Sequence, residues 1–259
     1  MQAGSEPVRL GLIGVGHWGQ AILRTLQGMA GVEVVAVCRR GASPAAALPA
    51  GCIAHADWRD LLRMDAIAGV IVATPAPTHA EIALAALEMG KAVFVEKPMA
   101  TAVDDARRVR DAAVRHQAVL HVDHIDLHNR AWQAAVEEQS LLGPVRRIEA
   151  EFGAVAARAA SPPSRWEWGP HPLALCISLL GVPEVVRAHL RRAGGQASGD
   201  LTEVGLVFSS GATAELVVGT GFDERRRRMT LQAERGTVTY DDNAPSKLVR
   251  ETAEGRASS

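Results

Sequence analysis

An acid, a base and a proline stand in direct succession at Glu96, Lys97 and Pro98, after the apolar run 92–95. A lysine held partly out of water can pass a proton to or from a substrate hydroxyl, and Glu96 is better suited to orient it than to react itself. Pro98 ends the strand, and a cis peptide bond there would turn the chain sharply and fix the direction of Lys97. Taken alone, the triplet is more typical of a surface ion pair at a strand end.

A second motif with chemical meaning is the turn GVGHWG at residues 14–19, which follows an apolar strand and precedes a helical pattern. In this context a GxGxxG turn predicts dinucleotide binding. Gly14 permits the tight turn, Gly16 lets the backbone approach a pyrophosphate, and Gly19 allows close packing of helix on sheet, with the phosphates at the positive helix end. The expected cofactor-binding residues here are Gly14, Gly16, His17, Trp18 and Gly19.

The tip of the next strand indicates which dinucleotide to expect. NAD-binding folds place an acid about 20 residues beyond the glycines for the ribose hydroxyls, but Arg39 and Arg40 stand here. A planar guanidinium can hold a 2′-phosphate with two hydrogen bonds. We therefore expect NADP as the cofactor, with NAD as the alternative if both arginines face solvent.

The elements that must position these residues follow two patterns. Up to about Val122, strands that are apolar on both faces alternate with helical stretches, which predicts a parallel sheet covered on both sides. Thr101 is expected to cap one of the helices, with Asp104 in the place of a capping-box acid. Beyond Val122, short strands joined by turns such as Ser209–Gly211 predict a mostly antiparallel sheet. The expected fold class is therefore α/β, an N-terminal Rossmann doubly wound parallel sheet followed by a C-terminal α+β domain.

Length and composition restrict the function. The chain has 259 residues, is 47% hydrophobic and carries 28 basic and 29 acidic residues. Near-zero net charge gives no reason to expect nucleic acid or a membrane surface as a partner. Three scattered cysteines favour a reducing compartment, and no signal peptide or spanning segment is recognised, so we expect a cytoplasmic protein.

Three stretches together resemble the glucose-fructose oxidoreductase/inositol dehydrogenase/rhizopine catabolism (Gfo/Idh/MocA) family of NAD(P)-dependent oxidoreductases. They are the glycine turn, TPAPTH at 74–79, and GKAVFVEKP at 90–98. The resemblance implies an NAD(P)-binding Rossmann domain at 1–122 and a substrate-binding and oligomerisation domain at 123–259, which would make a homodimer or homotetramer through its open sheet. It also implies that Lys97 is catalytic, and that Thr74, Pro75, His79 and Glu96 contact the cofactor.

The same resemblance points to a second catalytic group in WEWGPHPLA, residues 166–174. His171 fills the place of the family's histidine, and Glu167 stands where an aspartate is usual. Ala174 replaces a further aspartate, which weakens the expectation of ordinary sugar contacts. An imidazole suits proton transfer because its ordinary pKa is near the working pH. Trp166 and Trp168 are expected either to wall a substrate ring or to belong to the core.

Two further stretches allow competing interpretations. In HVDHIDLHNR, residues 121–130, His124 and His128 with the nearby aspartates could bind a metal. We favour packing at the domain junction, or substrate contact by His124 or Asn129, and expect no metal. The arginines 225–228 are expected to form a solvated strand edge rather than an anion site.

The function that these features predict is reversible hydride transfer between nicotinamide and a hydroxyl-bearing carbon of a sugar, cyclitol or sugar derivative such as a nucleotide sugar. Lys97 and His171 would carry the proton, and Glu167 would orient or polarise one of them. The alternative is a catalytically inactive dinucleotide-binding sensor of the same fold. Reduction of a non-sugar carbonyl or imine is a third hypothesis.

Overall fold

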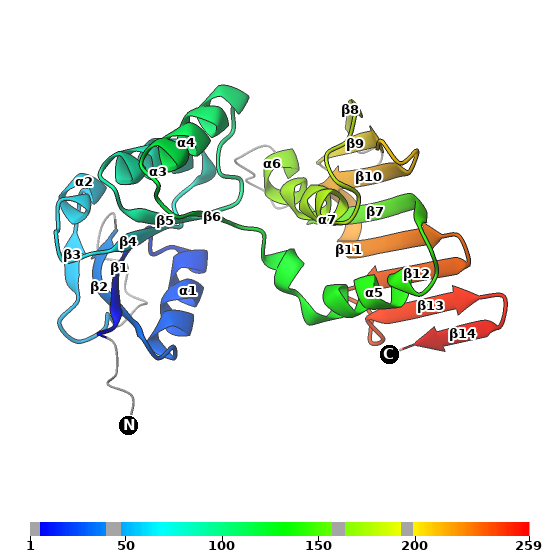
Figure 1. Ribbon diagram of the computed structural model, residues 1–259, viewed down its shortest axis with the longest axis horizontal. Coiled ribbons are helices and arrows are strands. Elements are labelled where there is room, and N and C mark those ends of the chain that lie inside the picture. Colours follow the sequence, from blue (N-terminus) through cyan, green and yellow to red (C-terminus); the bar gives the residue numbers. More distant parts are fainter. Residues whose placement is uncertain (1–5, 40–47, 157–163, 193–198, 259) are drawn as a thin grey trace. The chain divides into compact units, whose positions relative to one another are not determined.

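The computed structural model describes residues 6–39, 48–156, 164–192 and 199–258. These residues belong to two compact units, Met1–Asp123 and His124–Ser259 (Figure 1). Among the described helices, none has the length and apolar character that a bilayer crossing requires.

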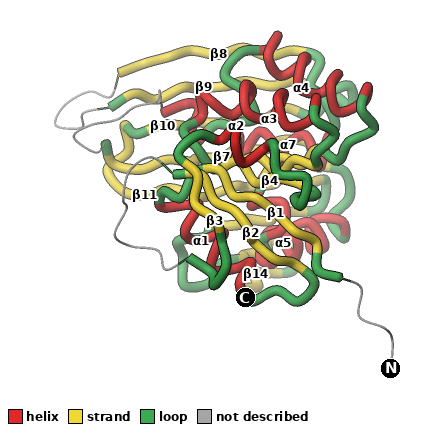
Figure 2. Tube along the Cα trace, turned by 90° about the vertical axis from the view of Figure 1, so that its left-hand side faces the viewer, coloured by secondary structure: helices red, strands yellow, loops and turns green. Residues whose placement is uncertain are grey.

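The first unit is a six-stranded parallel sheet with strand order β3-β2-β1-β4-β5-β6. Figure 2 shows β1, β2 and β3 running together with helices around them. Its strands are β1 (Val8–Ile13), β2 (Val32–Cys38), β3 (Ile53–His55), β4 (Gly69–Val72), β5 (Ala92–Glu96) and β6 (Leu120–Asp123). Its helices are α1 (His17–Gln27), α2 (Trp58–Leu62), the 3₁₀ turn η1 (Ala76–Thr78), α3 (His79–Glu88) and α4 (Val103–Arg115).

Two apolar layers hold this sheet. On one face, Leu12, Val34 and Ile71 pack with Leu23 of α1. On the other, a larger cluster joins the sheet to α2, α3 and α4 through residues such as Ile82. Because both faces are covered, the strands need no polar face, which explains the unbroken apolar runs. The apolar layers cover both faces of the sheet. Polar, ligand-binding side chains are therefore expected in the loops at the carboxyl ends of the strands.

The second unit is an eight-stranded sheet with strand order β14-β13-β12-β11-β7-β10-β9-β8. All neighbouring pairs are antiparallel except β7 with β10. Its strands are β7 (Val145–Val155), β8 (Val185–Arg192), β9 (Asp200–Val207), β10 (Thr213–Gly219), β11 (Gly221–Ala233), β12 (Gly236–Asp241), β13 (Leu248–Thr252) and β14 (Gly255–Ser258). Its helices are η2 (Ile125–His128), α5 (Arg130–Ser140), α6 (Ser164–Trp168) and α7 (Pro170–Leu180).

The helices of this unit gather on one face of its sheet (Figure 1). The core there joins Phe152, Leu216 and Met229 of the strands to Trp132 of α5 and Leu175 of α7. No described helix covers the opposite face, where polar side chains alternate with the buried ones along each strand. The unit is thus a two-layer sandwich of helices on a sheet.

The predicted fold class is confirmed in both halves, and the 209–211 turn does join an antiparallel pair. Three details of the prediction were incomplete or wrong. The short strand β3 and the final hairpin β13–β14 were missed, because neither has a continuous apolar run. Thr101 does not cap α4, whose N-cap is Ala102 without a side-chain cap.

Candidate functional site

The glycine turn has the geometry that a bound pyrophosphate requires. Gly14 adopts φ +95°, and a Cβ there would lie 2.6 Å from the carbonyl oxygen of Ala73. A Cβ at Gly19 would overlap the carbonyl oxygen of Gly14, so α1 packs directly on the turn. Above Gly16, by contrast, a Cβ would meet no heavy atom of the described chain within 4 Å. No side chain caps the start of α1 at Gly16, so its first N–H groups are not used by a capping side chain and these residues fit a dinucleotide.

The two neighbouring positions in the turn, His17 and Trp18, begin α1 and are exposed, with their rings 6.0 Å apart. Arg39 follows β2, is half-buried, and donates its backbone N–H to the carbonyl of His55. Arg40 lies outside the described residues. The predicted cofactor contacts of these side chains stay predictions.

His79 ties together two loops at the same end of the sheet. Its side chain is 2% exposed, its Nδ1 lies 2.8 Å from the carbonyl oxygen of Pro98, and its Nε2 lies 2.6 Å from that of Thr74. The hydroxyl of Thr78 lies 2.7 Å from that of Thr74. His79 is therefore built to position the loops after β4 and β5 rather than to face solvent, as an exposed helix-start residue would.

Glu96 and Asp123 form a pair of carboxyl groups at the ends of β5 and β6. They are partners in the strand register and share a side-chain hydrogen bond. Burial raises the pKa of Glu96 to about 7, and the negative charge of Asp123 adds to the rise. Lys97 follows directly, is half-buried, and precedes a cis bond to Pro98, as the sequence suggested. An acid that holds its proton near neutrality thus adjoins the candidate proton-transfer lysine.

In the second unit, a buried cluster surrounds His171. Pro170 occupies the first position of α7, and His171 follows it with 7% exposure. The Nδ1 atom of His171 lies 2.6 Å from Oδ2 of Asp126, a residue that is itself 3% exposed. The ring of Phe152 stacks beside the imidazole at 6.4 Å between centroids and 17° between planes.

Arg227 of β11 completes this cluster. Its Nη2 lies 3.2 Å from Oδ2 of Asp126 and 3.4 Å from Nδ1 of His171. Its Nη1 lies 3.8 Å from Asp242, which also pairs with Lys247. The prediction of a solvated edge for the 225–228 run was therefore wrong at this position, because β11 is an interior strand and Arg227 points to the helix face with 15% of its side chain exposed.

Sequence reasoning did not connect Asp126 or Arg227 with His171. Asp126 was weighed only as a possible metal ligand beside His124 and His128, although its carboxylate is committed to His171 and Arg227. Among the described residues, no group of three or more His, Cys, Asp or Glu could hold a metal ion. The sequence did contain a signal. Arg227 is in phase with Met229 and Leu231, which are buried along β11, and an arginine on the buried side of a strand needs a partner of opposite charge.

The other predicted residues around His171 have mixed placements. Glu167 lies on α6, one turn before His171, and is exposed. Trp168 lies 6.4 Å from the imidazole ring, whereas Trp166 has no described ring contact with it. Asn129 uses its Oδ1 to cap α5 and its Nδ2 to bond the hydroxyl of Tyr240, so its amide serves the fold.

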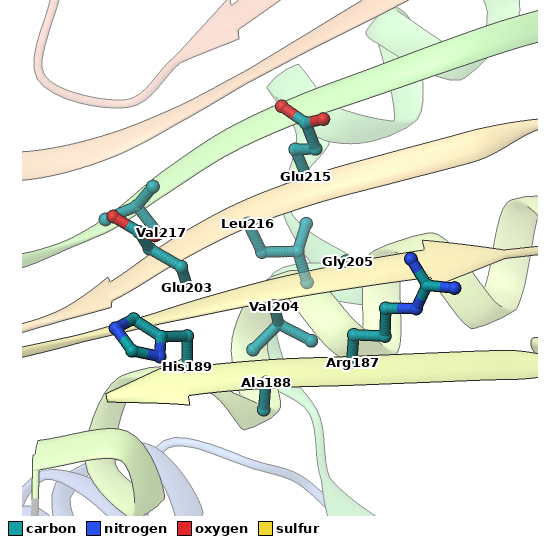
Figure 3. Close-up of a pocket in the computed structure, with 9 residues that line it drawn as sticks. All are labelled: Arg187, Ala188, His189, Glu203, Val204, Gly205, Glu215, Leu216 and Val217. Atoms are coloured by element: carbon teal, nitrogen blue, oxygen red, sulfur yellow. The ribbon is translucent and has the colours of Figure 1, made fainter. Parts of the chain in front are cut away.

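The open face of the second sheet carries a depression of about 560 Å³ across β8, β9 and β10 (Figure 3). Two rows of side chains cross it in register. One is Arg187, Gly205 and Glu215, and the other is His189, Glu203 and Val217. Gly205 leaves a gap between opposite charges, since a Cβ there would meet no heavy atom within 4 Å in the described chain.

A glycine turn that opens a helix at the end of a parallel strand defines a Rossmann-type nucleotide-binding unit. Residues 8–124 match the oxidoreductase family described as "Oxidoreductase family, NAD-binding Rossmann fold" (GFO_IDH_MocA). Over 108 residues the chain is 43% identical to inositol 2-dehydrogenase 3 of Saccharopolyspora erythraea, a match that covers 40% of this chain and 32% of that protein. The chain thus spans about a third of the length of the curated relatives it matches.

Similarity to solved structures extends over both units. A Magnetospirillum magnetotacticum MS-1 protein described as an oxidoreductase is 32% identical with a TM-score of 0.86, covering 95% of this chain and 81% of that one. The UDP-N-acetylglucosamine 3-dehydrogenase of Acidithiobacillus ferrooxidans is 25% identical with a TM-score of 0.83, covering 98% and 83%. Residues 8–124 thus match the Gfo/Idh/MocA family of oxidoreductases, and the likeness to solved oxidoreductases extends over both units.

Proposed function

We propose that this chain is an NADP-dependent oxidoreductase that acts on a hydroxyl-bearing carbon of a sugar, cyclitol or nucleotide sugar. The observation that carries the proposal is the glycine turn after β1, whose open space above Gly16 lies at the same sheet edge as Lys97 after β5. Parallel strands bring these loops to one edge, which is where open α/β sheets bind ligands. The first unit is then the cofactor domain and the second the substrate and oligomerisation domain.

The cofactor would be held by the backbone of the glycine turn and the start of α1, with Arg39 and Arg40 toward a 2′-phosphate and Thr74, Pro75 and Glu96 along its length. The chemistry that a nicotinamide cofactor supplies when bound is hydride transfer. Lys97 would give a proton to the substrate oxygen during reduction and take it back during oxidation. Its neighbour Glu96, whose pKa is raised to about 7 by burial, would hold a second proton close by.

His171 is the second residue to which we assign proton exchange with the substrate. Its buried ring is held between Phe152 and Asp126, and a group with fixed orientation is an effective acid or base. Glu167 would orient or polarise Lys97 or His171 from its place on α6. The substrate class follows from the relatives, one an inositol dehydrogenase and one a nucleotide-sugar dehydrogenase.

We further propose that the open face of the second sheet joins copies of the chain as a homodimer or homotetramer. Arg187 and Glu215 flank the gap at Gly205 with opposite charges, so a second copy could place unlike charges against them. Gly205→Phe places a ring at a position where a Cβ meets no described heavy atom within 4 Å, and it should shift the mass measured by light scattering toward the monomer. Ser210→Phe, in the exposed turn after β9, is the matched control that should leave the mass unchanged.

A second candidate function is a dinucleotide-binding sensor without turnover. The observation that favours it is the pair of departures at Glu167 and Ala174 from the family pattern. Tight binding of NADPH with no oxidation or reduction across a panel of polyols and nucleotide sugars would support the sensor.

Two measurements test the enzyme. Lys97→Ala should lower kcat about 100-fold or more, the ordinary contribution of a general acid or base, while the Kd for NADPH stays unchanged; retained turnover removes the role of Lys97. Arg39→Ala should weaken the binding of NADPH about tenfold or more, because a hydrogen bond to a charged group contributes about 1.5–3 kcal/mol, and it should leave the affinity for NADH unchanged. Equal affinity of the wild type for both cofactors would contradict the preference for NADP.

A further inference from the structure

Three side chains from three elements meet at one oxygen atom in the second unit. Oδ2 of Asp126, on η2, lies 2.6 Å from Nδ1 of His171 on α7 and 3.2 Å from Nη2 of Arg227 on β11. The same Nη2 lies 3.4 Å from Nδ1. Nδ1 of the imidazole therefore has two neighbours of opposite hydrogen-bonding character.

Hydrogen-bonding rules decide how such a trio can be arranged. A guanidinium only donates, a carboxylate only accepts, and a neutral imidazole donates from one nitrogen and accepts at the other. While Asp126 is present, its oxygen accepts from Nδ1 and from Arg227, so the ring proton is on Nδ1. Without Asp126, the guanidinium would find the lone pair of Nδ1 as its nearest acceptor, and the ring proton would move to Nε2.

We propose that Asp126 is a positioning residue that decides which nitrogen of His171 carries the proton. It holds the Nδ1–H form against the competing guanidinium of Arg227, and it thereby assigns proton exchange with the substrate to Nε2. This inference rests on the proposed function for its catalytic consequence, although the tautomer itself can be observed without any turnover.

The surroundings keep each member of the trio in place. Phe152 stacks on the imidazole and Trp168 lies against it at 49°. Asn129 caps α5 directly after η2 and bonds Tyr240, which fixes the end of the segment that carries Asp126. Arg227 is held at its other end by Asp242, itself paired with Lys247. Other charged or titratable groups on described elements packed against α7 include Glu167 and Arg165 of α6 and His128 of η2.

The tautomer can be read directly by NMR. The protein is labelled with ¹⁵N-histidine, and the carbon-bound ring protons are correlated with the two ring nitrogens. At alkaline pH, where the imidazole is neutral, the two nitrogen shifts distinguish the Nδ1–H form from the Nε2–H form. The chain has nine histidines, and His171→Gln identifies the signals of interest. We expect Nδ1–H in the wild type and Nε2–H in Asp126→Ala.

Two variants make the test specific. Asp126→Asn keeps an oxygen acceptor at the same place and should keep Nδ1–H. The double variant Asp126→Ala with Arg227→Met removes the competing donor as well and should lose the strong preference for Nε2–H. Nε2–H in the wild type, or Nδ1–H unchanged in Asp126→Ala, would overturn the proposal. If Asp126→Ala does not fold, the wild-type tautomer and its retention in Asp126→Asn still decide the matter.

Turnover gives the second readout. Asp126→Ala should lower kcat about 100-fold with the Kd for NADPH unchanged, and Asp126→Asn should recover part of the loss because the tautomer is kept. A merely structural aspartate would give parallel losses in both variants without a change of tautomer, which would count against the proposal. If the tautomers behave as expected but the wild type turns over nothing, the proposed function fails while the positioning role stands.

Discussion

Asp123 and Asp126 are three positions apart in the sequence but have opposite electrostatic surroundings. Asp123 ends β6 in the first unit and faces another carboxyl group, Glu96, across the strand register. Asp126 lies near the start of the second unit, is 3% exposed, and faces an imidazole and a guanidinium. The first aspartate raises the pKa of its neighbour, whereas the second provides the negative charge that two hydrogen-bond donors share.

This contrast shows that an aspartate can have two different roles: it can help a neighbouring acid to keep a proton, or it can orient hydrogen-bond donors. Two carboxyl groups in contact cannot both ionise easily, so one of them keeps a proton near neutral pH. A carboxylate between two donors stays ionised and fixes their orientation instead. The first arrangement stores a proton beside Lys97, and the second aims the ring of His171.

Replacement of the two aspartates by alanine should give the largest difference. Asp126→Ala removes the anion from a buried ion pair and leaves Asp242, at 3.8 Å, as the acidic partner of Arg227 within the described residues, which should lower the free energy of unfolding by about 3 kcal/mol or more. Asp123→Ala should change it by less than about 1 kcal/mol, because the lost hydrogen bond is offset by relief of a like-charge pair. Chemical denaturation of both variants beside the wild type measures the difference. Equal losses would mean that the two surroundings are energetically alike.

The pH dependence of stability should be the next largest effect. The pKa of Glu96 rises from the ordinary 4.5 to about 7, with burial as the first cause. The folded chain therefore holds more proton than the unfolded chain between these values, so the stabilising contribution is complete below about 4.5 and is lost as the pH rises through about 7.

Asp123→Asn should narrow that window, since it removes the negative charge and leaves only burial to raise the pKa of Glu96. Denaturant unfolding across the acidic and neutral range would show a shallower fall of stability with pH than in the wild type. Asp111→Asn, an exposed aspartate paired with Arg110 on α4, is the control that should keep the wild-type slope. An unaltered slope in Asp123→Asn would show that the carboxyl pair does not share the proton.

The first unit could be predicted almost entirely from local patterns. Gly14, Gly16 and Gly19 each have a conformational or steric reason that a short motif records, and Lys97 follows a strand whose end is marked by proline. Strand order and the sheet edge then follow from the rules for parallel α/β folds. The pairing of Glu96 with Asp123 did not follow, because it depends on the register of two strands 27 residues apart.

The second unit was predicted only in outline. His171 and the strands were found, but its partners Asp126 and Arg227 come from segments 45 and 56 residues away along the chain. Antiparallel order alone does not say which strand is interior, and so the arginine run was taken for an edge. Contacts of that range are fixed by tertiary packing, which spacing in one sequence does not encode.

A smaller effect than that of Asp126→Ala is expected from Arg227→Lys, which changes the cation beside Asp126 and keeps its charge. A lysine keeps a positive charge beside Asp126 but cannot bridge to Asp242 with a planar fork. The loss is partly offset, because the Nε–H of Arg227 is buried without a hydrogen-bond partner in the described chain and lysine has no such donor.

We therefore expect Arg227→Lys to lower the free energy of unfolding by only about 1 kcal/mol, with His171 still in the Nδ1–H form because Asp126 still accepts from it. Denaturation and the ¹⁵N-histidine spectrum measure the two quantities independently. A loss as large as that of Asp126→Ala would mean that the guanidinium fork, rather than the carboxylate, holds the cluster together. A small loss of stability with an unchanged tautomer would confirm that the tautomer of His171 depends on Asp126. In that case one cation can replace another beside the carboxylate, whereas the carboxylate itself cannot be removed.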